Sequence, residues 1–516
     1  MIHPRTPVLI GGGQTTFRGS PSENPNSIEM CAITARLAAD NAGLTSDTLK
    51  QLDGIAVVSF SIDTPGALGG LDVPRSKHPP KALAIVLGAT PNWLPYTLTG
   101  GDVPQALVND VAERIAAGQN DFVLLSGAEF LNSLMKQMRS GIVMNFPDYQ
   151  IADDETPERV GNGRDSNTLH ERDHGLGFPT NVYPIFENAL RAHLGRSIDD
   201  HSKVMGDLFA PFSQVAAANP HAWFKTAHTS QELVTVTDKN RMVGFPYPKY
   251  LNAIIQVDQS ASVLMASYEK AKALGIADAD MVFLHGCAAT VEKWHVLERV
   301  NYYSSPAMDI GVREAFKMAG KTLEDMAYFD LYSCFPVAVE FVASALGLAH
   351  NDPRGLTLTG GLPYFGGPGN NYTMHAIVEM IARCRSNPDA FGFINANGWY
   401  VTKHAFGIYS ATPTQGAWTR RSKDDYQCEI DALECPAITE TPDGPATIEA
   451  YTIVHAREGM RMGIVIGRDM QNRRFVASTP KGDLAIMADL EAQEGVGRTG
   501  VVHHLDGRNV FTPDPV

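Results

Sequence analysis

The sequence predicts an α/β fold built from two related halves, followed by a small β-barrel. Three observations support this prediction. Strand-like and helix-like segments alternate over residues 7–130, the same order of segments returns from residue 258 to about 410, and short alternating runs replace it after residue 425. With 516 residues, the chain is also long enough to form more than one packed domain.

The first half is predicted to begin with βαβ units. An apolar run over residues 6–10 reads as a strand, and a helical pattern that Ser27 caps extends to Ala42. Three further segments follow: an apolar run at 52–60, a helix at 103–117 that stops at Gly118, and a buried strand at 121–126. We assign residues 1–130 to this half.

The middle of the chain interrupts the pattern. Residues 131–250 contain polar, proline-bearing stretches with isolated helices, so we interpret them as an insertion or loop domain. The second half is assigned to residues 251–420. Its predicted elements are strands at 258–267, 281–285 and 327–332 and helices at 268–274, 308–319 and 336–346.

The C-terminal segment, residues 425–516, has a different texture. Its alternating runs lie at 446–455, 463–467, 474–478 and 500–503, and turn residues separate them. Such runs are typical of a small β-barrel, here of the oligonucleotide/oligosaccharide-binding type. The barrel by itself indicates no function.

Composition narrows the classes of partner. The net charge is −15, and the basic residues are scattered singly, so we expect no nucleic-acid partner and no membrane partner. A small phosphate can still bind at a helix N-terminus. The six cysteines form no CxxC pair, so reduced thiols and no metal site are expected. The N-terminus lacks a signal-peptide pattern, and we expect a cytoplasmic protein.

Three loops in the second half carry the strongest motifs: DLYSCFP at 330–336, GGLPYFGGPGNN at 360–371 and NANGWYVTKHAFG at 395–407. In this order they resemble the three C-terminal active-site loops of thiolases, most closely those of type-1 thiolase-like proteins. The resemblance covers about residues 5–420, and the tail looks like the additional C-terminal domain of that subgroup. It implies a five-layer αβαβα fold. Thiolases are usually dimers through the first half, so a homodimer and a partner protein bound through the C-terminal domain both remain open.

The resemblance also implies an activity. Thiolases join or split carbon chains as coenzyme A (CoA) thioesters through a nucleophilic cysteine at a helix N-terminus, where the helix dipole stabilises the thiolate. Here Gly100 stands where that cysteine belongs, just before the helix at 103. Thr99 and Asp102 are poor substitutes without an adjacent base. The acyl-CoA is expected as substrate, and no permanently bound cofactor is expected.

The next loop supplies the best catalytic candidates. By resemblance, Tyr332 replaces the Asn or His that holds the thioester oxygen, and its hydroxyl can still donate a hydrogen bond. Cys334 matches the cysteine of the sterol-carrier-protein type of thiolase. The alternative for Cys334 is a buried small hydrophobe.

The remaining loops offer weaker candidates. The Gly-His-Pro motif of thiolases is here Gly366-Gly367-Pro368, so its histidine is missing. Gly367 and Asn371 could offer backbone and amide donors, or could only form a tight turn. We also predict substrate contacts at Gly100, Asp102, Asn397 and His375, the last against a core role. His404 is predicted as an acid/base because its ordinary pKa lies near neutrality, against a structural role.

Three hypotheses follow. The first is a thiolase-like acyltransferase that makes or breaks C–C bonds of acyl-CoA thioesters without an acyl-enzyme, with Cys334 as base and His404 assisting. The second is a catalytically inactive protein of the same fold that binds acyl-CoA or lipid or acts as a scaffold. The third is a purely structural role. Convergence of Cys334, Tyr332, Asn397 and His404 in one cleft would favour the enzyme.

Overall fold

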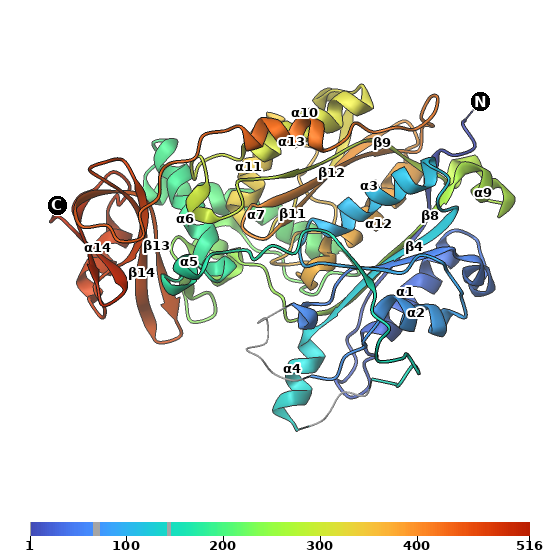
Figure 1. Ribbon diagram of the computed structural model, residues 1–516, viewed down its shortest axis with the longest axis horizontal. Coiled ribbons are helices and arrows are strands. Elements are labelled where there is room, and N and C mark those ends of the chain that lie inside the picture. The colour runs from blue at the N-terminus through green and yellow to red at the C-terminus, as the bar shows by residue number, and fades with distance from the viewer. Residues whose placement is uncertain (1, 65–72, 142–145, 516) are drawn as a thin grey trace.

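The computed structural model describes residues 2–64, 73–141 and 146–515 (Figure 1). Elements of the first half are β1 (Pro7–Thr16), α1 (Ser27–Asn41), β2 (Gly54–Val57), α2 (Pro79–Leu87), β3 (Pro95–Thr97), α3 (Val103–Ala116) and β4 (Phe122–Phe130). Those of the second half are β8 (Asp258–Ser267), α9 (Tyr268–Ala273), β9 (Val282–Val291), α10 (Pro306–Ala319), β10 (Met326–Asp330), α11 (Pro336–Leu346), α12 (Tyr372–Ser386), β11 (Phe391–Gly398), β12 (Lys403–Ser410) and α13 (Asp424–Asp431).

Between the halves lie α4 (Leu131–Arg139), β5 (Glu158–Val160), α5 (Leu169–Asp173), α6 (Pro179–His193), α7 (Ile198–Ala218), α8 (Ser230–Val234), β6 (Met242–Gly244) and β7 (Tyr247–Pro248). The barrel contains β13 (Gly444–Ala456), β14 (Gly459–Asp469), β15 (Arg474–Ser478), α14 (Leu484–Ala492), β16 (Thr499–Leu505) and β17 (Arg508–Pro513). The alternating pattern of the tail did not reveal α14 or β17.

The main sheet runs β10-β11-β12-β9-β1-β8-β4-β2-β3-β5, and β1 joins its two parts. Strand β1 pairs with β8 along most of its length but with β9 only at Val8 and Leu9. Beyond that joint, helices separate the two parts. Helices α1 and α2 cover the outer face of one part, and α10 and α11 cover the outer face of the other. Helices α3 and α12 pack between them. The predicted five-layer αβαβα fold is therefore confirmed.

The central position of α3 and α12 determines the site. Their apolar residues share one buried cluster with strand residues of both halves, including Leu9, Val263 and Ile394. Such a helix is buried on nearly all sides, which explains the apolar positions along α3. Each helix follows a glycine-containing loop. Because the two helices pack against each other in the central layer, these two loops meet inside the molecule. Sequence periodicity predicts each helix but not this meeting.

The insertion is more helical than its polar, proline-bearing sequence suggests. Helices α6 and α7 contain internal prolines, Pro184 and Pro211, yet both bury large aromatic side chains. They contact α11, and α6 also contacts β13 of the barrel. The insertion therefore packs between the barrel and the second half, and Figure 1 shows its green helices beside the red strands of the barrel.

The tail forms a closed barrel of five strands in the order β13-β14-β15-β17-β16, with β16 returning to β13. The predicted C-terminal β-barrel is thus confirmed.

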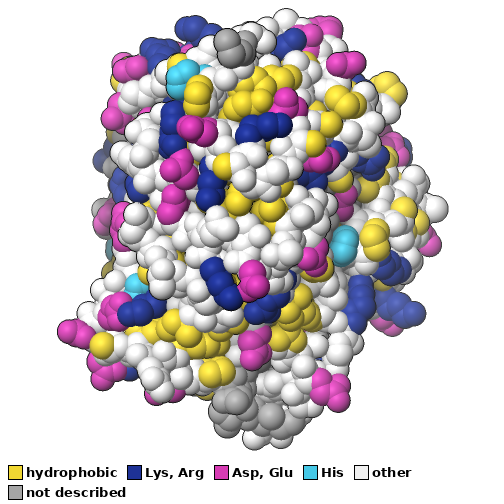
Figure 2. All heavy atoms as spheres, turned by 90° about the vertical axis from the view of Figure 1, so that its right-hand side faces the viewer, with side chains coloured by type: hydrophobic (Ala, Val, Ile, Leu, Met, Phe, Trp, Pro, Cys, Tyr) yellow, Lys and Arg dark blue, Asp and Glu magenta, His cyan; other side chains and the backbone are white. Residues whose placement is uncertain are grey.

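Figure 2 shows the face of the molecule opposite the barrel, and basic and acidic side chains are interspersed on it. Within the described ranges, no helix has the length and apolar character needed to cross a membrane.

Candidate functional site

A cavity of about 520 Å³ lies where the loop before α3, the loop after β10 and the start of α6 meet. Five predicted residues line it: Gly100, Tyr332, Cys334, Gly367 and Asn397. The remaining lining residues are Ser61, Thr64, Thr99, Gly101, Leu131, Phe178, Pro179, Thr180, Tyr183, Ala253, Ile255, Phe335, Leu362, Gly369, Asn370 and Trp399. This volume and mostly apolar wall suit a small-molecule ligand.

Tyr332 presents its hydroxyl to the loop before α3. A Cβ added at Gly101 would overlap Tyr332 Oη, so the glycine leaves the space in which the hydroxyl lies. No hydrogen bond joins Oη to another described residue, whereas the Tyr332 backbone N–H donates to Asn395 Oδ1 at 3.1 Å. Burial raises the pKa of Tyr332 well above 10. The hydroxyl therefore stays protonated and can donate to a substrate oxygen.

Cys334 lies beside Asn397 and Tyr183. Asn397 Nδ2 is 3.9 Å from Cys334 Sγ and donates to Tyr183 Oη at 2.8 Å. Burial raises the pKa of the Cys334 thiol to about 12, although the neighbouring Tyr183 and nearby backbone groups lower it in part. At neutral pH this group is a thiol, and a thiol is a weak base.

The hairpin between β11 and β12 is conformationally strained. Trp399 and Val401 both have positive φ angles, of 56° and 54°, which are unfavourable for side chains of this size. Tyr183 Oη donates to Trp399 O at 2.7 Å and accepts from Val401 N at 3.3 Å. The buried Arg299 guanidinium donates to Val401 O at 2.8 Å. These contacts hold Trp399 at the cavity wall, and strain of this kind concentrates at functional sites.

The space behind Gly100, the position that the resemblance to thiolases would give to a cysteine, is filled by other side chains. A Cβ at Gly100 would overlap Asp102 Oδ1 and Lys403 Nζ. Lys403 Nζ lies 3.3 Å from that carboxylate and donates to Thr99 O at 2.6 Å. Both side chains are nearly buried, at 6% and 12% exposure for Lys403 and Asp102. An ion pair therefore occupies the space that a side chain at position 100 would need.

His404 does not join the other candidates. It lies on β12 and is only 1% exposed, and it borders a separate cavity with Asp102 and Lys403. Its two ring nitrogens have no hydrogen-bond partner among the described residues. Burial lowers its pKa to about 3. His404 is thus placed as a neutral core residue that does not line the 520 Å³ cavity, although it lies opposite Asn397 in the β11–β12 pairing.

Two other predicted residues also lie outside the cavity. Asn371 Nδ2 donates to the backbone oxygens of Gly127 and Ala261, at 2.8 and 3.3 Å, and its neighbour Asn370 lines the cavity instead. His375 is fully buried within α12, and its Nδ1 is 2.8 Å from Gln14 Oε1. Burial lowers the pKa of His375 to about 3. Both side chains hold backbone or core partners in place.

Sequence reasoning missed four residues around the cavity: Tyr183, Trp399, Lys403 and Glu129. Tyr183 comes from the insertion and has no partner nearby in sequence. Glu129, the penultimate residue of β4, lies beside Ser61 and Gly369, and burial raises its pKa to about 7. A glutamate inside an otherwise apolar strand pattern was the available signal for this last residue.

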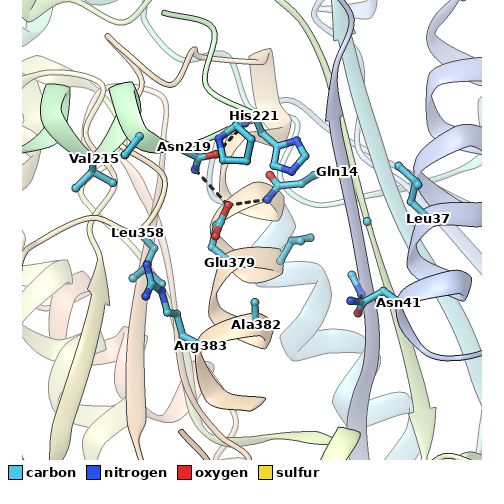
Figure 3. A pocket seen from close by; sticks show the side chains of 15 residues that line it. Gln14, Leu37, Asn41, Val215, Asn219, His221, Leu358, Glu379, Ala382 and Arg383 are labelled. Carbon is cyan, nitrogen blue, oxygen red and sulfur yellow. Dashed lines mark hydrogen bonds between the residues drawn. The ribbon is translucent and has the colours of Figure 1, made fainter. Parts of the chain in front are cut away.

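A second cavity, of about 640 Å³, lies beside β1 and α12 (Figure 3). Gln14 Nε2 and Asn219 Nδ2 point toward Glu379 Oε1 and donate to it at 2.8 and 3.2 Å. None of the predicted site residues lines this cavity. Because its central carboxylate already has protein donors, we interpret the cluster as structural.

One buried cluster has ligand types suited to a metal: Glu187, His201 and Glu340. Arg196 Nη1 lies 3.2 Å from His201 Nδ1, and an arginine can only donate, so Nδ1 must be the acceptor. The ring proton is then on Nε2, which lies 2.5 Å from Glu187 Oε1. A metal would need the Nε2 lone pair, so we assign no metal to this cluster.

Comparisons with known proteins agree with this architecture. A model of the thiolase-like protein type 1 additional C-terminal domain matches residues 425–508. No curated protein matches the chain. A solved structure of a monomeric SCP2-thiolase-like protein type 1 from Mycobacterium smegmatis is 36% identical, with a TM-score of 0.84. The match covers 99% of this chain and 100% of that one.

Two more distant structures share the fold. An Ltp2-ChsH2(DUF35) aldolase is 17% identical with a TM-score of 0.57, over 80% of this chain and 100% of that one. An acetyl-CoA acetyltransferase from Syntrophomonas wolfei is 15% identical with a TM-score of 0.53, over 79% of this chain and 99% of that one. Together with the five-layer core and the C-terminal barrel, the 36% identity over nearly the whole chain shows the family. The chain belongs to the SCP2-thiolase-like proteins of type 1.

Proposed function

We propose that the chain binds an acyl-CoA thioester in the 520 Å³ cavity and makes or breaks a C–C bond next to the thioester, without forming an acyl-enzyme. One observation carries this proposal. Tyr332 Oη has no partner among the described residues and borders the open cavity, while position 100 is closed by the Lys403–Asp102 pair. The cavity thus offers an oxyanion donor but no nucleophile at that position.

The apolar wall of the cavity suits an apolar acyl chain. Phe178 and Ile255 line the cavity but remain 69% and 56% exposed, so they form an apolar mouth. Leu131, Phe335 and Leu362 continue the apolar surface inward. Exposed aromatic and aliphatic side chains at a mouth bind apolar ligands at the expense of water. The substrate class is therefore an acyl thioester with an apolar acyl group.

The chemistry needs only an oxygen donor and a base. When a base removes the α-proton of a thioester, negative charge develops on the thioester oxygen. The Tyr332 hydroxyl can donate to that oxygen, and such a donor contributes most where water is excluded. Trp399 Nε1 is buried and has no partner among the described residues, so it is a second available donor.

Relatives of this fold include catalysts of both related types. The names of the two distant structures describe an aldolase and an acetyl-CoA acetyltransferase. Both reactions change a C–C bond beside a carbonyl group. The Mycobacterium smegmatis protein is described as monomeric, and we propose the same state for this chain in place of a thiolase-type homodimer. Sedimentation at micromolar concentration tests that state, and a dimer would contradict it.

A second candidate function is acyl-CoA or lipid binding without catalysis. The raised pKa of Cys334, about 12, and the absence of His404 from the cavity lining favour it, because Cys334 stays protonated and His404 does not face the bound ligand. This candidate requires the same cavity and the same ligand. It differs only in lacking a base within reach of the bound thioester.

Calorimetric titration with CoA and a panel of acyl-CoAs separates these candidates. The proposed enzyme binds acyl-CoA, and the wild type but not Tyr332→Phe exchanges the α-hydrogens of the bound thioester with solvent. Binding without exchange would support the binding protein. Absence of any binding would contradict both candidates.

A further inference from the structure

Glu129 is a buried carboxyl group close to the cavity, and it has no role in the proposed function described above. It is the penultimate residue of strand β4, directly before Phe130, and is fully buried. On β4 its side chain shares a face with Gly127, whose missing Cβ makes room for Asn371 of the loop before α12. Glu129 therefore points into the central layer, where the glycine-rich loops meet.

Two residues separate Glu129 from the cavity, and both are small. A Cβ added at Gly369 would overlap Glu129 Oε2 and Ser61 Oγ, so the three groups border one small space. Gly369 also has a φ of +54°, a conformation that glycine adopts without strain. Ser61 and Gly369 both line the cavity, whereas Glu129 is fully buried and does not line it.

Hydrogen bonds hold the carboxyl group in this place. The Ser61 N–H donates to Glu129 Oε2 at 3.3 Å, and the Phe130 N–H donates to Oε1 at 3.0 Å. Burial raises the pKa of Glu129 to about 7, while these N–H groups and the Ser61 hydroxyl lower it in part. Asp258 on β8 raises it further by its charge and is itself held by donors on Asn24, Asn132 and Ser133.

We infer that Glu129 is the proton acceptor for the cavity and that it acts through the Ser61 hydroxyl, which is the group that meets the substrate. This inference rests on the proposed function and deepens it. The thioester α-carbon gives its proton to Ser61 Oγ while the Ser61 hydroxyl proton passes to Glu129 Oε2. The carboxylate becomes a neutral acid, the substrate becomes an enolate, and Tyr332 donates to the enolate oxygen. The reverse transfer protonates the carbon.

This arrangement assigns different tasks to the titratable side chains. Tyr332 and Cys334 both have raised pKa values and remain protonated at neutral pH. A base must be deprotonated in a substantial fraction of molecules at the working pH. Glu129 meets that requirement near pH 7, and it needs no histidine in the cavity.

The test follows hydrogen–deuterium exchange of butyryl-CoA in deuterated buffer. We expect wild-type exchange to rise with pH through about 7 and then level, since only the carboxylate accepts a proton. Glu129→Gln and Ser61→Ala should each slow exchange by about 100-fold or more while butyryl-CoA still binds. Glu379→Gln, in the second cavity, is the matched control and should exchange like the wild type.

Two outcomes overturn the inference. Exchange in Glu129→Gln at the wild-type rate would do so, and so would wild-type exchange that is independent of pH between 5 and 9. Glu129→Gln must bind butyryl-CoA normally for its loss of exchange to count in favour, and loss of binding in this variant would assign Glu129 a structural role instead.

A ligand-free measurement separates this inference from the proposed function. The infrared carboxyl band of the wild type minus that of Glu129→Gln should titrate near pH 7. If butyryl-CoA does not bind at all, the proposed function fails, and a band titrating near 7 still supports Glu129 and Ser61 as a proton store facing the cavity. A band that titrates below pH 5 overturns that assignment whatever binds.

Discussion

The two central helices, α3 and α12, begin at the same cavity after loops rich in glycine, yet their entrances differ. Before α3, the Lys403–Asp102 ion pair fills the space behind Gly100. Before α12, the space behind Gly369 holds a carboxyl group with a pKa raised to about 7. One loop is electrostatically neutralised and closed to a side chain, and the other retains an ionisable group.

The two loops therefore border the same cavity with different groups behind them. Gly100 has no side chain, and a lysine from the facing hairpin lies where a Cβ at this position would be. If the space behind Gly100 were empty, the buried cavity would lower the free energy of unfolding. According to our inference, the proton acceptor is Glu129, which lies behind Gly369 in the loop before α12.

The largest expected effect concerns the closed entrance. Lys403→Ala leaves the Asp102 carboxylate buried without its partner, and removing one partner of a buried ion pair costs about 3–5 kcal/mol. Chemical denaturation should show that loss of unfolding free energy. Lys272→Ala, which breaks an exposed ion pair with Asp278, should cost less than about 1 kcal/mol.

A double-mutant cycle sharpens this prediction. Gly100→Ala should also destabilise, because its Cβ overlaps Lys403 Nζ and Asp102 Oδ1. Combined with Lys403→Ala, its cost should shrink, since the two changes act on one space. Strict additivity of the two free energies would show that the ion pair does not fill position 100.

The next effect concerns the oxyanion donor. Tyr332→Phe removes a hydroxyl that borders the cavity, and loss of one such donor slows a reaction by about 100- to 1,000-fold. Deuterium exchange of bound butyryl-CoA is the measurement, with calorimetry to confirm that binding persists. Tyr328→Phe on β10, four residues before Tyr332 and outside the cavity, is the control. An unchanged exchange rate in Tyr332→Phe would remove Tyr332 from the proposed chemistry.

Glu129, behind the loop before α12, should make the stability of the protein depend on pH. The pKa of Glu129 is raised from 4.5 to about 7 on folding, so its contribution is fully present below pH 4.5 and is lost as pH rises through 7. The shift corresponds to about 3 kcal/mol over that window. Glu129→Gln should flatten this part of the curve of unfolding free energy against pH. A difference between the two proteins that stays constant from pH 4 to 8 would contradict the raised pKa.

The smallest effect is expected at Cys334. Because its thiol has a pKa of about 12 and stays protonated, Cys334→Ala should change deuterium exchange by less than about 10-fold. Cys384→Ala, a buried cysteine of α12 away from the cavity, controls for lost packing. A loss of exchange as large as that in Tyr332→Phe would instead make Cys334 the base, as its resemblance to thiolases suggests.

The sequence by itself determined the order of strands and helices, the repeat of the two halves and the C-terminal barrel. These features depend on local periodicity, turn residues and motif order, which a single chain displays directly. It also indicated that Gly100, Tyr332, Cys334, Gly367 and Asn397 belong to one site, because the loops follow the order known from thiolases. All five line the cavity.

Only the tertiary structure decided which ionisable groups face one another. His404 lies opposite Asn397 in the β11–β12 pairing, yet only Asn397 lines the cavity, while the neighbouring Lys403 reaches Asp102. Glu129 and Ser61 are 68 residues apart and meet only because β4 and the segment after β2 end at the same edge of the sheet. The pKa of a side chain depends on burial and neighbours, and these are set by packing between distant segments rather than by the local sequence.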